Sequence, residues 1–401
     1  MEESQKGVLS GVTILDFTQV LSGPYGTMWL SDLGATVIKV ENPGKGDVTR
    51  SYPPIKMDGM CAYFASLNRG KLGITVNLKT EEGKQIIRTL AKQVDVIAQN
   101  FRPGVMERLG LGYRDLRQIN PRLIYANVSG FGSNGPDAQL PGYDVISQGV
   151  GGIMELTGHV GGPPTRVGSS VGDTMGGIGM AIGILAALLA RDRTGLGTEV
   201  DVSLTDMITS MCTREFVRYF GGGEIPTRMG NRYKLWHPYG LYKAKDGYYA
   251  IACGTERHFE LLAKGILKLD EETFRRYDTH EKRVADRAGV DVLINGWAAE
   301  KTVKEVTDTL VSNGVPAGPV LDIRELVKDP QIAKARNMFP WLEQPGLGRL
   351  QVTNTPIRFS RSEIRSPQPA PMLGQDNEKV LSDYLGLSKE EIATLKAKAV
   401  I

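Results

Sequence analysis

The alternation of strand and helix patterns near the start of the chain constrains its fold more than any other feature. Residues 12–17 (VTILDF) form a short apolar run typical of a buried strand, and residues 22–24 (SGP) mark a turn at which proline enters a helix. That helix is expected to end near residue 33, and residues 35–40 (ATVIKV) have the pattern of a second strand. Strand, helix and strand in this order form a βαβ unit, which predicts a parallel sheet with right-handed crossovers.

The same alternation continues through the first half of the chain. We expect a helix over residues 81–92 and strands over 94–98 and 123–128. A further strand over 198–202 leads into another helix. The fold class is therefore expected to be α/β.

The pattern changes after three glycines at 221–223. Strands expected over 239–242 and 248–253 flank the sequence Lys-Asp-Gly at 245–247, which is a hairpin signal. Helices rich in charged residues follow between 280 and 310. We interpret this region as a second, smaller α+β domain.

Charge and cysteine usage argue against several classes of protein. The 48 Lys and Arg residues are interleaved with 45 Asp and Glu residues and give a net charge of +3, so nothing resembles a basic arm for nucleic acid. Cys61, Cys212 and Cys253 have no paired spacing, and no CxxC or HExxH motif occurs. We therefore expect neither a metal site nor a disulfide framework. We also expect the protein to work in a reducing compartment.

The ends and apolar runs of the sequence favour a protein of the cytoplasm. The N-terminus is polar with no apolar core behind it, so no secretory signal is expected. The longest apolar run, over 175–190, is shorter than the roughly 20 residues that cross a bilayer. We expect a cytoplasmic protein that contacts no membrane.

The turn at 22–26 (SGPYG) is the first candidate binding motif. A helix N-terminus after a strand can bind phosphate, and Glu41 after the second strand could contact a ribose. The glycine spacing is not GxGxxG, so a nicotinamide-dependent dehydrogenase is poorly supported. An ordinary helix turn started by proline explains the motif equally well.

The segment 100–108 (NFRPGVMER) follows another expected strand, where ligands bind in open α/β sheets. Phe101 could stack on an adenine, and Arg102 and Arg108 could bind phosphates. Solvated surface arginines on a short helix are the competing interpretation.

Asp173 is the most informative single residue. It stands directly before a Gly- and Ala-rich apolar helix, so we predict that it is the N-cap. Backbone N–H groups and the helix dipole would then keep its carboxylate ionised, and neighbouring glycines would leave room for a bulky substrate. An ionised and reachable carboxylate is what covalent catalysis on an acyl group needs. Capping alone is the structural alternative.

Together these motifs resemble the CaiB/BaiF family (family III) of CoA-transferases from about residue 9 to residue 401. The matching stretches occur in the family's order, and they are Leu15-Asp16-Phe17-Thr18 with Gly23-Pro24, Asp32-Leu33-Gly34-Ala35, Val37 to Glu41, Gly46-Asp47 with Arg50, Asn68 to Lys71, Asn100 to Gly104, Ser129 to Gly132, Pro141 to Asp144, Val171 to Asp173, Gly318-Pro319-Val320, and Pro371 to Gln375. The members that the chain most resembles are formyl-CoA transferase and the succinyl-CoA:dicarboxylate CoA-transferases.

The resemblance implies a fold, an assembly and a binding site. The large Rossmann-like parallel-sheet domain would comprise residues 1–220 and 330–401, a small α+β domain would be inserted at 221–329, and two subunits would interlock as a homodimer. CoA would bind as a substrate, with no tightly held cofactor and no metal. The implied CoA contacts are Leu21, Ser22, Asn42, Val76, Asn77, Lys79, Asn100, Phe101, Arg102, Arg108, Pro141, Gly142, Tyr143 and Asp144.

The resemblance also assigns the nucleophile to Asp173. It would form an aspartyl–acyl anhydride with the donor and then an aspartyl-CoA thioester, which conserves the thioester energy without ATP. The run of four glycines found in formyl-CoA transferases is absent after Arg232, which argues against oxalate or formate and favours dicarboxylic acids such as succinate or glutarate. Arg166, Arg228, Arg232 and His237 are candidates to bind a second carboxylate.

Two other functions compete with the transferase. Racemases of 2-methylacyl-CoA in the same family use a Gly-His-Asp triplet, whereas this chain has Gly142-Tyr143-Asp144, and a tyrosine with a pKa near 10 is a poor base for that step. A CoA-binding protein without catalytic activity is the other alternative, and it is favoured if replacing Asp173 changes nothing.

Overall fold

The computed structural model describes residues 7–53, 56–57, 60–362 and 364–401, and these form two compact units. The first unit comprises Met1–Met154, Arg166–Gly223 and Pro330–Ile401, and the second comprises Glu155–Thr165 and Glu224–Asp329. Each unit has its own hydrophobic core.

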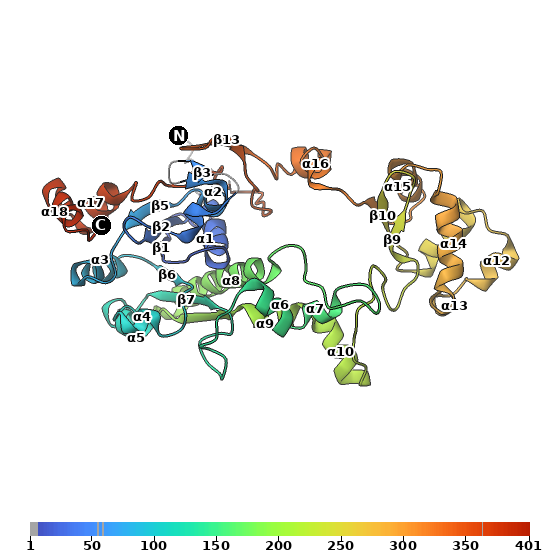
Figure 1. The fold of residues 1–401 in the computed structure, drawn as a ribbon, viewed down its shortest axis with the longest axis horizontal. Helices are drawn as coiled ribbons and strands as arrows, with labels where there is room; N and C mark the ends of the chain where they lie inside the picture. Colours follow the sequence, from blue (N-terminus) through green and yellow to red (C-terminus); the bar gives the residue numbers. More distant parts are fainter. Residues whose placement is uncertain (1–6, 54–55, 58–59, 363) are drawn as a thin grey trace. The chain divides into compact units, whose positions relative to one another are not determined.

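A six-stranded parallel sheet forms the centre of the first unit (Figure 1). In spatial order its strands are β5 (Leu72–Thr75), β2 (Thr36–Glu41), β1 (Thr13–Asp16), β6 (Val96–Gln99), β7 (Ile124–Ser129) and β8 (Glu199–Ser203). Numbered along the chain, these six strands have the order 3-2-1-4-5-6, which is that of the Rossmann fold. The predicted parallel sheet and the opening βαβ unit are confirmed.

Helices cover both faces of this sheet, which explains why its strands are continuous apolar runs. Ile14, Val37 and Val96 point to one face, whereas the next residues, Leu15, Ile38 and Ile97, point to the other. The first face packs against α1 (Ser22–Asp32), α8 (Val171–Thr194) and α9 (Leu204–Met211). The second packs against α3 (Glu81–Ala91), α4 (Val105–Arg108), α5 (Tyr113–Ile119), α17 (Asn377–Leu385) and α18 (Lys389–Ala397).

The long helix α8 packs closely against its neighbours through glycines. A Cβ atom on Gly177 would lie 2.3 Å from the carbonyl oxygen of Ser22, and one on Gly183 would lie 2.5 Å from Val200 Cγ1. Helix α8 has 24 residues and is more extensive than the predicted apolar run of 175–190. In the part of the chain that the structure describes, it is the one helix long and apolar enough to cross a bilayer, and here it packs on β7, β8 and α1.

The C-terminal segment covers the edge of the sheet at β5. The carboxylate of Asp376 accepts a hydrogen bond from Gly73 N (2.7 Å), and Asn377 Oδ1 accepts one from Thr75 N (2.8 Å). Asn77 N donates to the carbonyl of Val400 (2.7 Å), and Val400 and Ile401 are both buried. Figure 1 shows α17 and α18, in red, beside the blue and teal N-terminal elements. The first unit is thus completed by both ends of the chain.

The remaining elements of the first unit are short. They are η1 (Val48–Ser51), β3 (Lys56–Met57), β4 (Met60–Cys61), α2 (Ala62–Asn68), α6 (Asp144–Val150), α7 (Ile153–Leu156), which extends past the unit boundary, α10 (Thr213–Gly222), η3 (Pro330–Ala335), β12 (Trp341–Gln344) and β13 (Gly348–Gln351).

The second unit is a small antiparallel sheet covered by helices. Its strand order is β11 (Ala317–Pro319), β10 (Tyr248–Ala252) and β9 (Tyr239–Lys243), and the predicted β9–β10 hairpin is confirmed. The helices are α11 (Glu256–Glu260), η2 (Leu261–Ile266), α12 (Glu271–Arg276), α13 (His280–Ala285), α14 (Arg287–Ala298), α15 (Val303–Ser312) and α16 (Ile323–Leu326).

Candidate active site

A cavity of about 220 Å³ lies at the carboxyl ends of β1, β6 and β7 in the first unit. The strand order reverses between β1 and β6, and ligands of open α/β sheets bind at this kind of switch point. The cavity is lined by Gln19, Val20, Leu21, Ser22, Asn100, Phe101, Arg102, Pro103, Val128, Ser129, Gly130, Ala138, Leu140, Pro141, Gly142, Tyr143, Asp173 and Leu204.

The loop after β1 is held in place on this cavity by side chains from three other segments. The amide of Asn100 accepts from Gln19 N (2.8 Å) and donates to Gln19 O (2.7 Å). Asp47 accepts from Val20 N (3.3 Å), and Lys39 Nζ donates to Thr18 O (2.8 Å). Val20 has a φ of +68°, which is costly for a β-branched residue. These contacts fix Leu21 and Ser22 at the cavity wall.

A buried ion pair supports the same loop from below. Lys71 Nζ lies 2.9 Å from Asp16 Oδ2, and both side chains are fully buried. Burial lowers the pKa of Lys71 to about 8, although Asp16 opposes this effect. Burial would raise the pKa of Asp16, but the positive charges of Lys71 and Lys39 outweigh it and hold that pKa below its usual value. The pair therefore remains ionised near neutral pH.

Asp173 lines the cavity, but it is not the N-cap of its helix. The N-cap is Ser170, and Asp173 is the third residue of α8. Its half-buried carboxylate makes no hydrogen bond with any residue that the structure describes. Burial raises the pKa of Asp173 to about 7, and the negative charge of Asp144 adds to this effect. The predictions that Asp173 is the N-cap, and that backbone N–H groups keep it ionised, were therefore wrong.

Asp144 takes the position that had been expected for Asp173. Its Oδ1 accepts from Gly172 N at the start of α8 (2.8 Å), and its Oδ2 accepts from the side chain of Gln148 (2.8 Å). Asp144 itself begins α6. A carboxylate from a neighbouring helix thus binds a free N–H group at the start of α8 and leaves Asp173 unpaired.

Two further groups at the site escaped the sequence prediction. The negative charge of Asp173, second to burial, helps to raise the pKa of Tyr63 to about 12, so this phenol in α2 lies within electrostatic reach of Asp173. The hydroxyl of Ser129 at the end of β7 is buried and has no hydrogen-bond partner in the described structure. Neither residue was predicted as a site residue, although Ser129 lies in one of the stretches that resemble the family.

The structure gathers only some of the predicted CoA contacts. Eight of them line the cavity with Asp173, and they are Leu21, Ser22, Asn100, Phe101, Arg102, Pro141, Gly142 and Tyr143. Outside it, the Val76 side chain is in the core and Asp144 supports α8. Asn42, Lys79 and Arg108 are exposed, and Asn77 binds the C-terminal segment.

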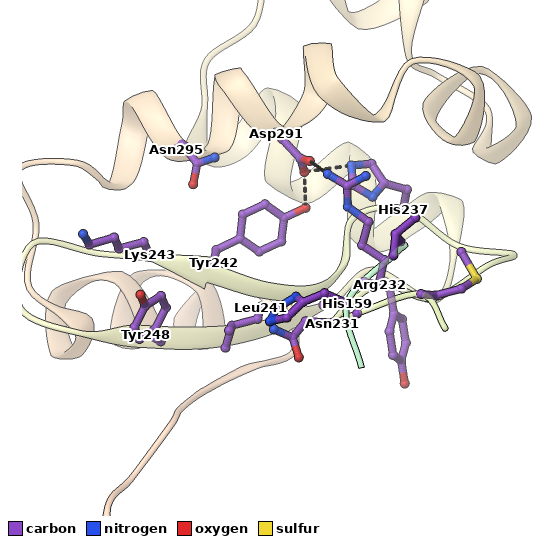
Figure 2. Close-up of a pocket in the computed structure, with 15 residues that line it drawn as sticks. His159, Asn231, Arg232, His237, Leu241, Tyr242, Lys243, Tyr248, Asp291 and Asn295 are labelled. Carbon is purple, nitrogen blue, oxygen red and sulfur yellow. Dashed lines mark hydrogen bonds and ion pairs between the residues drawn. The ribbon is translucent and has the colours of Figure 1, made fainter. Parts of the chain in front are cut away.

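A larger cavity of about 590 Å³ occurs in the second unit (Figure 2). Asp291 on α14 is its centre, and this carboxylate lies 3.1 Å from His237 Nε2, 3.2 Å from an Arg232 nitrogen and 2.8 Å from the Tyr242 hydroxyl. Burial would raise the pKa of Asp291, but these partners, His237 first, lower it. The carboxylate of Asp291 is thus paired with other side chains of its own cavity.

The four predicted substrate residues do not form one site. Arg232 and His237 line the cavity of the second unit. Arg228, also in the second unit, binds Glu155 and the carbonyl of Gly162, whereas Arg166 is an exposed residue of the first unit. Among the described residues, no cluster of His, Cys, Asp and Glu could hold a metal ion.

Comparisons with known proteins agree with this geometry. Residues 9–377 match the family model described as CoA-transferase family III. The chain is 39% identical to the acetyl-CoA:oxalate CoA-transferase of Acetobacter aceti (94% of this chain, 96% of the relative) and 38% identical to the succinyl-CoA:mesaconate CoA-transferase of Haloarcula marismortui (94% and 96%). The crystal structure of a CAIB/BAIF family protein from Brucella suis superimposes with a TM-score of 0.84 at 36% identity, covering 95% of this chain and all of that one. The chain belongs to CoA-transferase family III and is a CoA-transferase of the CaiB/BaiF type.

Proposed function

We propose that this protein moves CoA from succinyl-CoA, or a similar dicarboxylyl-CoA, to a carboxylic acid through covalent intermediates on Asp173. One observation carries the proposal: Asp173 is the carboxylate that faces the switch-point cavity without a hydrogen-bond partner among the described residues. An unpaired carboxylate with a pKa of about 7 is ionised in a substantial fraction at neutral pH, and it is also more nucleophilic than an ordinary one.

The first half of the reaction consumes the donor. An oxygen of Asp173 forms a bond to the thioester carbonyl carbon, and the carbonyl electron pair moves onto its oxygen. When that pair returns, the carbon–sulfur bond breaks, so CoA thiolate leaves and an aspartyl–acyl anhydride remains. The thiolate then attacks the aspartyl carbon, which releases the donor acid and leaves an aspartyl-CoA thioester.

The second half runs the same steps with the acceptor. The acceptor carboxylate attacks the aspartyl carbon and releases CoA thiolate, which leaves an aspartyl–acceptor anhydride. The thiolate then attacks the acceptor carbonyl carbon of this anhydride. The products are the new acyl-CoA and the free Asp173 carboxylate. One thioester is broken and one is formed, so no ATP is needed.

The lining of the cavity supports CoA binding next to Asp173. Phe101 offers an aromatic face for the adenine, and the exposed guanidinium of Arg102 is free to neutralise phosphate. The name of the Haloarcula relative supports the substrate class, because succinate and mesaconate are both dicarboxylic acids. The Acetobacter relative is named for oxalate, against which the missing run of four glycines argues. Since one relative is named for acetyl-CoA and oxalate, both belong in any test of specificity.

We also propose that two copies assemble as an interlocked homodimer. Several large apolar side chains of the first unit are exposed, among them Val150 on α6, Leu189 on α8 and Phe220 on α10, with exposed fractions of 61%, 68% and 77%. Packing against a second copy would remove such side chains from water. Light scattering coupled to size-exclusion chromatography tests the assembly, and a monomer at micromolar concentration would contradict it.

Mass spectrometry of the purified protein tests the chemistry. We expect incubation with succinyl-CoA, glutaryl-CoA or acetyl-CoA to give a CoA-sized adduct on the peptide that contains Asp173, and hydroxylamine to remove it. Asp173→Ala should form none. If no donor gives an adduct but deuterium from solvent enters the acyl chain, the protein is a racemase. Binding without either signal would identify a non-catalytic CoA-binding protein.

A further inference from the structure

The hydroxyl of Ser22 is a feature of the active-site cavity that the proposed mechanism does not yet use. Ser22 is the first residue of α1, it is 6% exposed, and it lines the cavity that contains Asp173. Its Oγ is buried and makes no hydrogen bond with any described residue. A buried hydroxyl without a hydrogen-bond partner destabilises the fold. A hydroxyl of this kind that lines a cavity indicates a ligand that forms the missing hydrogen bond.

The packing of α1 on α8 places this hydroxyl close to Asp173. A Cβ atom on Gly176 would lie 2.9 Å from Ser22 Oγ. Gly176 follows Asp173 by three residues on α8, and residues with this spacing share a helix face with about 5–6 Å between their Cβ positions. Ser22 Oγ therefore lies against the face of α8 that also carries Asp173, and both residues line the same cavity.

The backbone around Ser22 favours negative charge at the same point. Helix α1 has 11 residues, and no side chain of the described residues caps its N-terminus. In the described structure no hydrogen bond uses the amide N–H of Ser22 or Gly23, and Pro24 has none to offer. Free N–H groups and the positive end of the helix dipole attract an anionic oxygen.

We infer that the Ser22 hydroxyl donates a hydrogen bond to the oxygen that becomes negative when Asp173 attacks the thioester carbonyl. The proton stays on Ser22 throughout, and the electron pair on the substrate oxygen returns to the carbon when the thiolate leaves. A donor held in a buried position acts mainly on the transition state, because the negative charge on the substrate oxygen develops only there. This inference rests on the proposed function, since it requires a covalent step at Asp173.

Two serine-to-alanine variants on the same helix separate this role from a structural one. Ser22→Ala removes a hydroxyl without a partner, so we expect its melting temperature to be unchanged or higher while kcat falls about 10- to 100-fold. Ser31→Ala is the matched control, because Ser31 is also buried but its Oγ donates to Gly70 O (2.9 Å). It should melt at a lower temperature with kcat within about twofold of the wild type.

The Asp173 adduct distinguishes failure of this inference from failure of the proposed function. When reactions are quenched at set times and analysed by mass spectrometry, Ser22→Ala should form the same adduct on Asp173 more slowly than the wild type. Ser22→Cys, with its weaker S–H donor, should form it at an intermediate rate. The inference alone is overturned if the wild type forms the adduct and Ser22→Ala forms it at the same rate. It is also overturned if a lowered melting temperature of Ser22→Ala accounts for its slower rate. If the wild type forms no adduct, the proposed function falls first and the inference with it.

Discussion

The switch-point cavity of the first unit and the Asp291 cavity of the second unit differ in what their charged groups are bound to. In the second unit the cavity is about 590 Å³, and Asp291 is paired with His237, Arg232 and Tyr242 (Figure 2). In the first unit the cavity is only about 220 Å³, but Asp173, Ser22 and Ser129 lack hydrogen-bond partners among the described residues.

This difference separates polar groups that stabilise the fold from polar groups that are available for catalysis. A carboxylate that is bound by three neighbours has a lowered pKa and stabilises the fold, as Asp291 does. A half-buried carboxylate without a hydrogen-bond partner in the described part of the chain destabilises the fold and is free to react, as Asp173 is. Whether its carboxylate has hydrogen-bond partners therefore identifies the active-site cavity better than the volume of the cavity does.

The largest expected effect comes from replacing the carboxylate of Asp173. Asp173→Asn should lower kcat at least about 1,000-fold, since it removes the nucleophile. It should also stabilise the protein by about 1–3 kcal/mol at pH 8 relative to pH 4, because the raised pKa of Asp173 means that ionisation between about pH 4 and pH 7 costs native-state stability. Transferase assays and thermal melts at both pH values measure the two effects.

Asp291→Asn is the matched comparison in the other cavity. It should destabilise the protein by about 1–3 kcal/mol at pH 7 and leave kcat within about threefold of the wild type. If Asp291→Asn abolished transfer while the protein remained folded, the distinction between the two cavities would be lost.

The pH dependence of the reaction gives the next effect. The ionised form of Asp173 is the nucleophile, so kcat/KM for the acyl-CoA should rise with pH to a midpoint at about pH 7 and fall about tenfold per unit below it. Asp144→Asn removes the neighbouring negative charge and should move the midpoint to lower pH, while the amide oxygen of the new side chain can still accept from Gly172 N. A midpoint near pH 4 in the wild type would contradict the environment described for Asp173.

The smallest expected effect concerns two arginines. Arg102 lines the first cavity without an ion pair in the described structure, so Arg102→Ala should raise KM for acyl-CoA about tenfold. Arg232 is already paired with Asp291, and Arg232→Ala should change that KM less than about twofold. Equal effects of both substitutions would show that the second cavity also takes part in binding.

Patterns that depend on neighbours in sequence were predicted well. The alternation from Thr13 to Glu41 required only that apolar runs and a proline-started helix follow one another, and the structure has them there. The carboxyl ends of β1 and β6 were likewise predictable as a site, because both strands could be located in the sequence and parallel strands end at one edge.

Features that depend on distant residues were not predictable. The hydrogen bond by which Asp144 caps α8 joins two residues that are 28 positions apart in the sequence. The ion pair of Asp16 and Lys71 below the loop joins residues that are 55 positions apart. Local reasoning placed Asp173 at free N–H groups and gave its pKa the wrong direction, because burial and Asp144 act only in the folded chain. Tyr63 carried no signal for the same reason.

The contacts of the C-terminal segment with β5 have a consequence for synthesis of the protein. The edge of the sheet is open until Asp376, Asn377 and Val400 have left the ribosome, so the nascent large unit exposes unpaired backbone during most of translation.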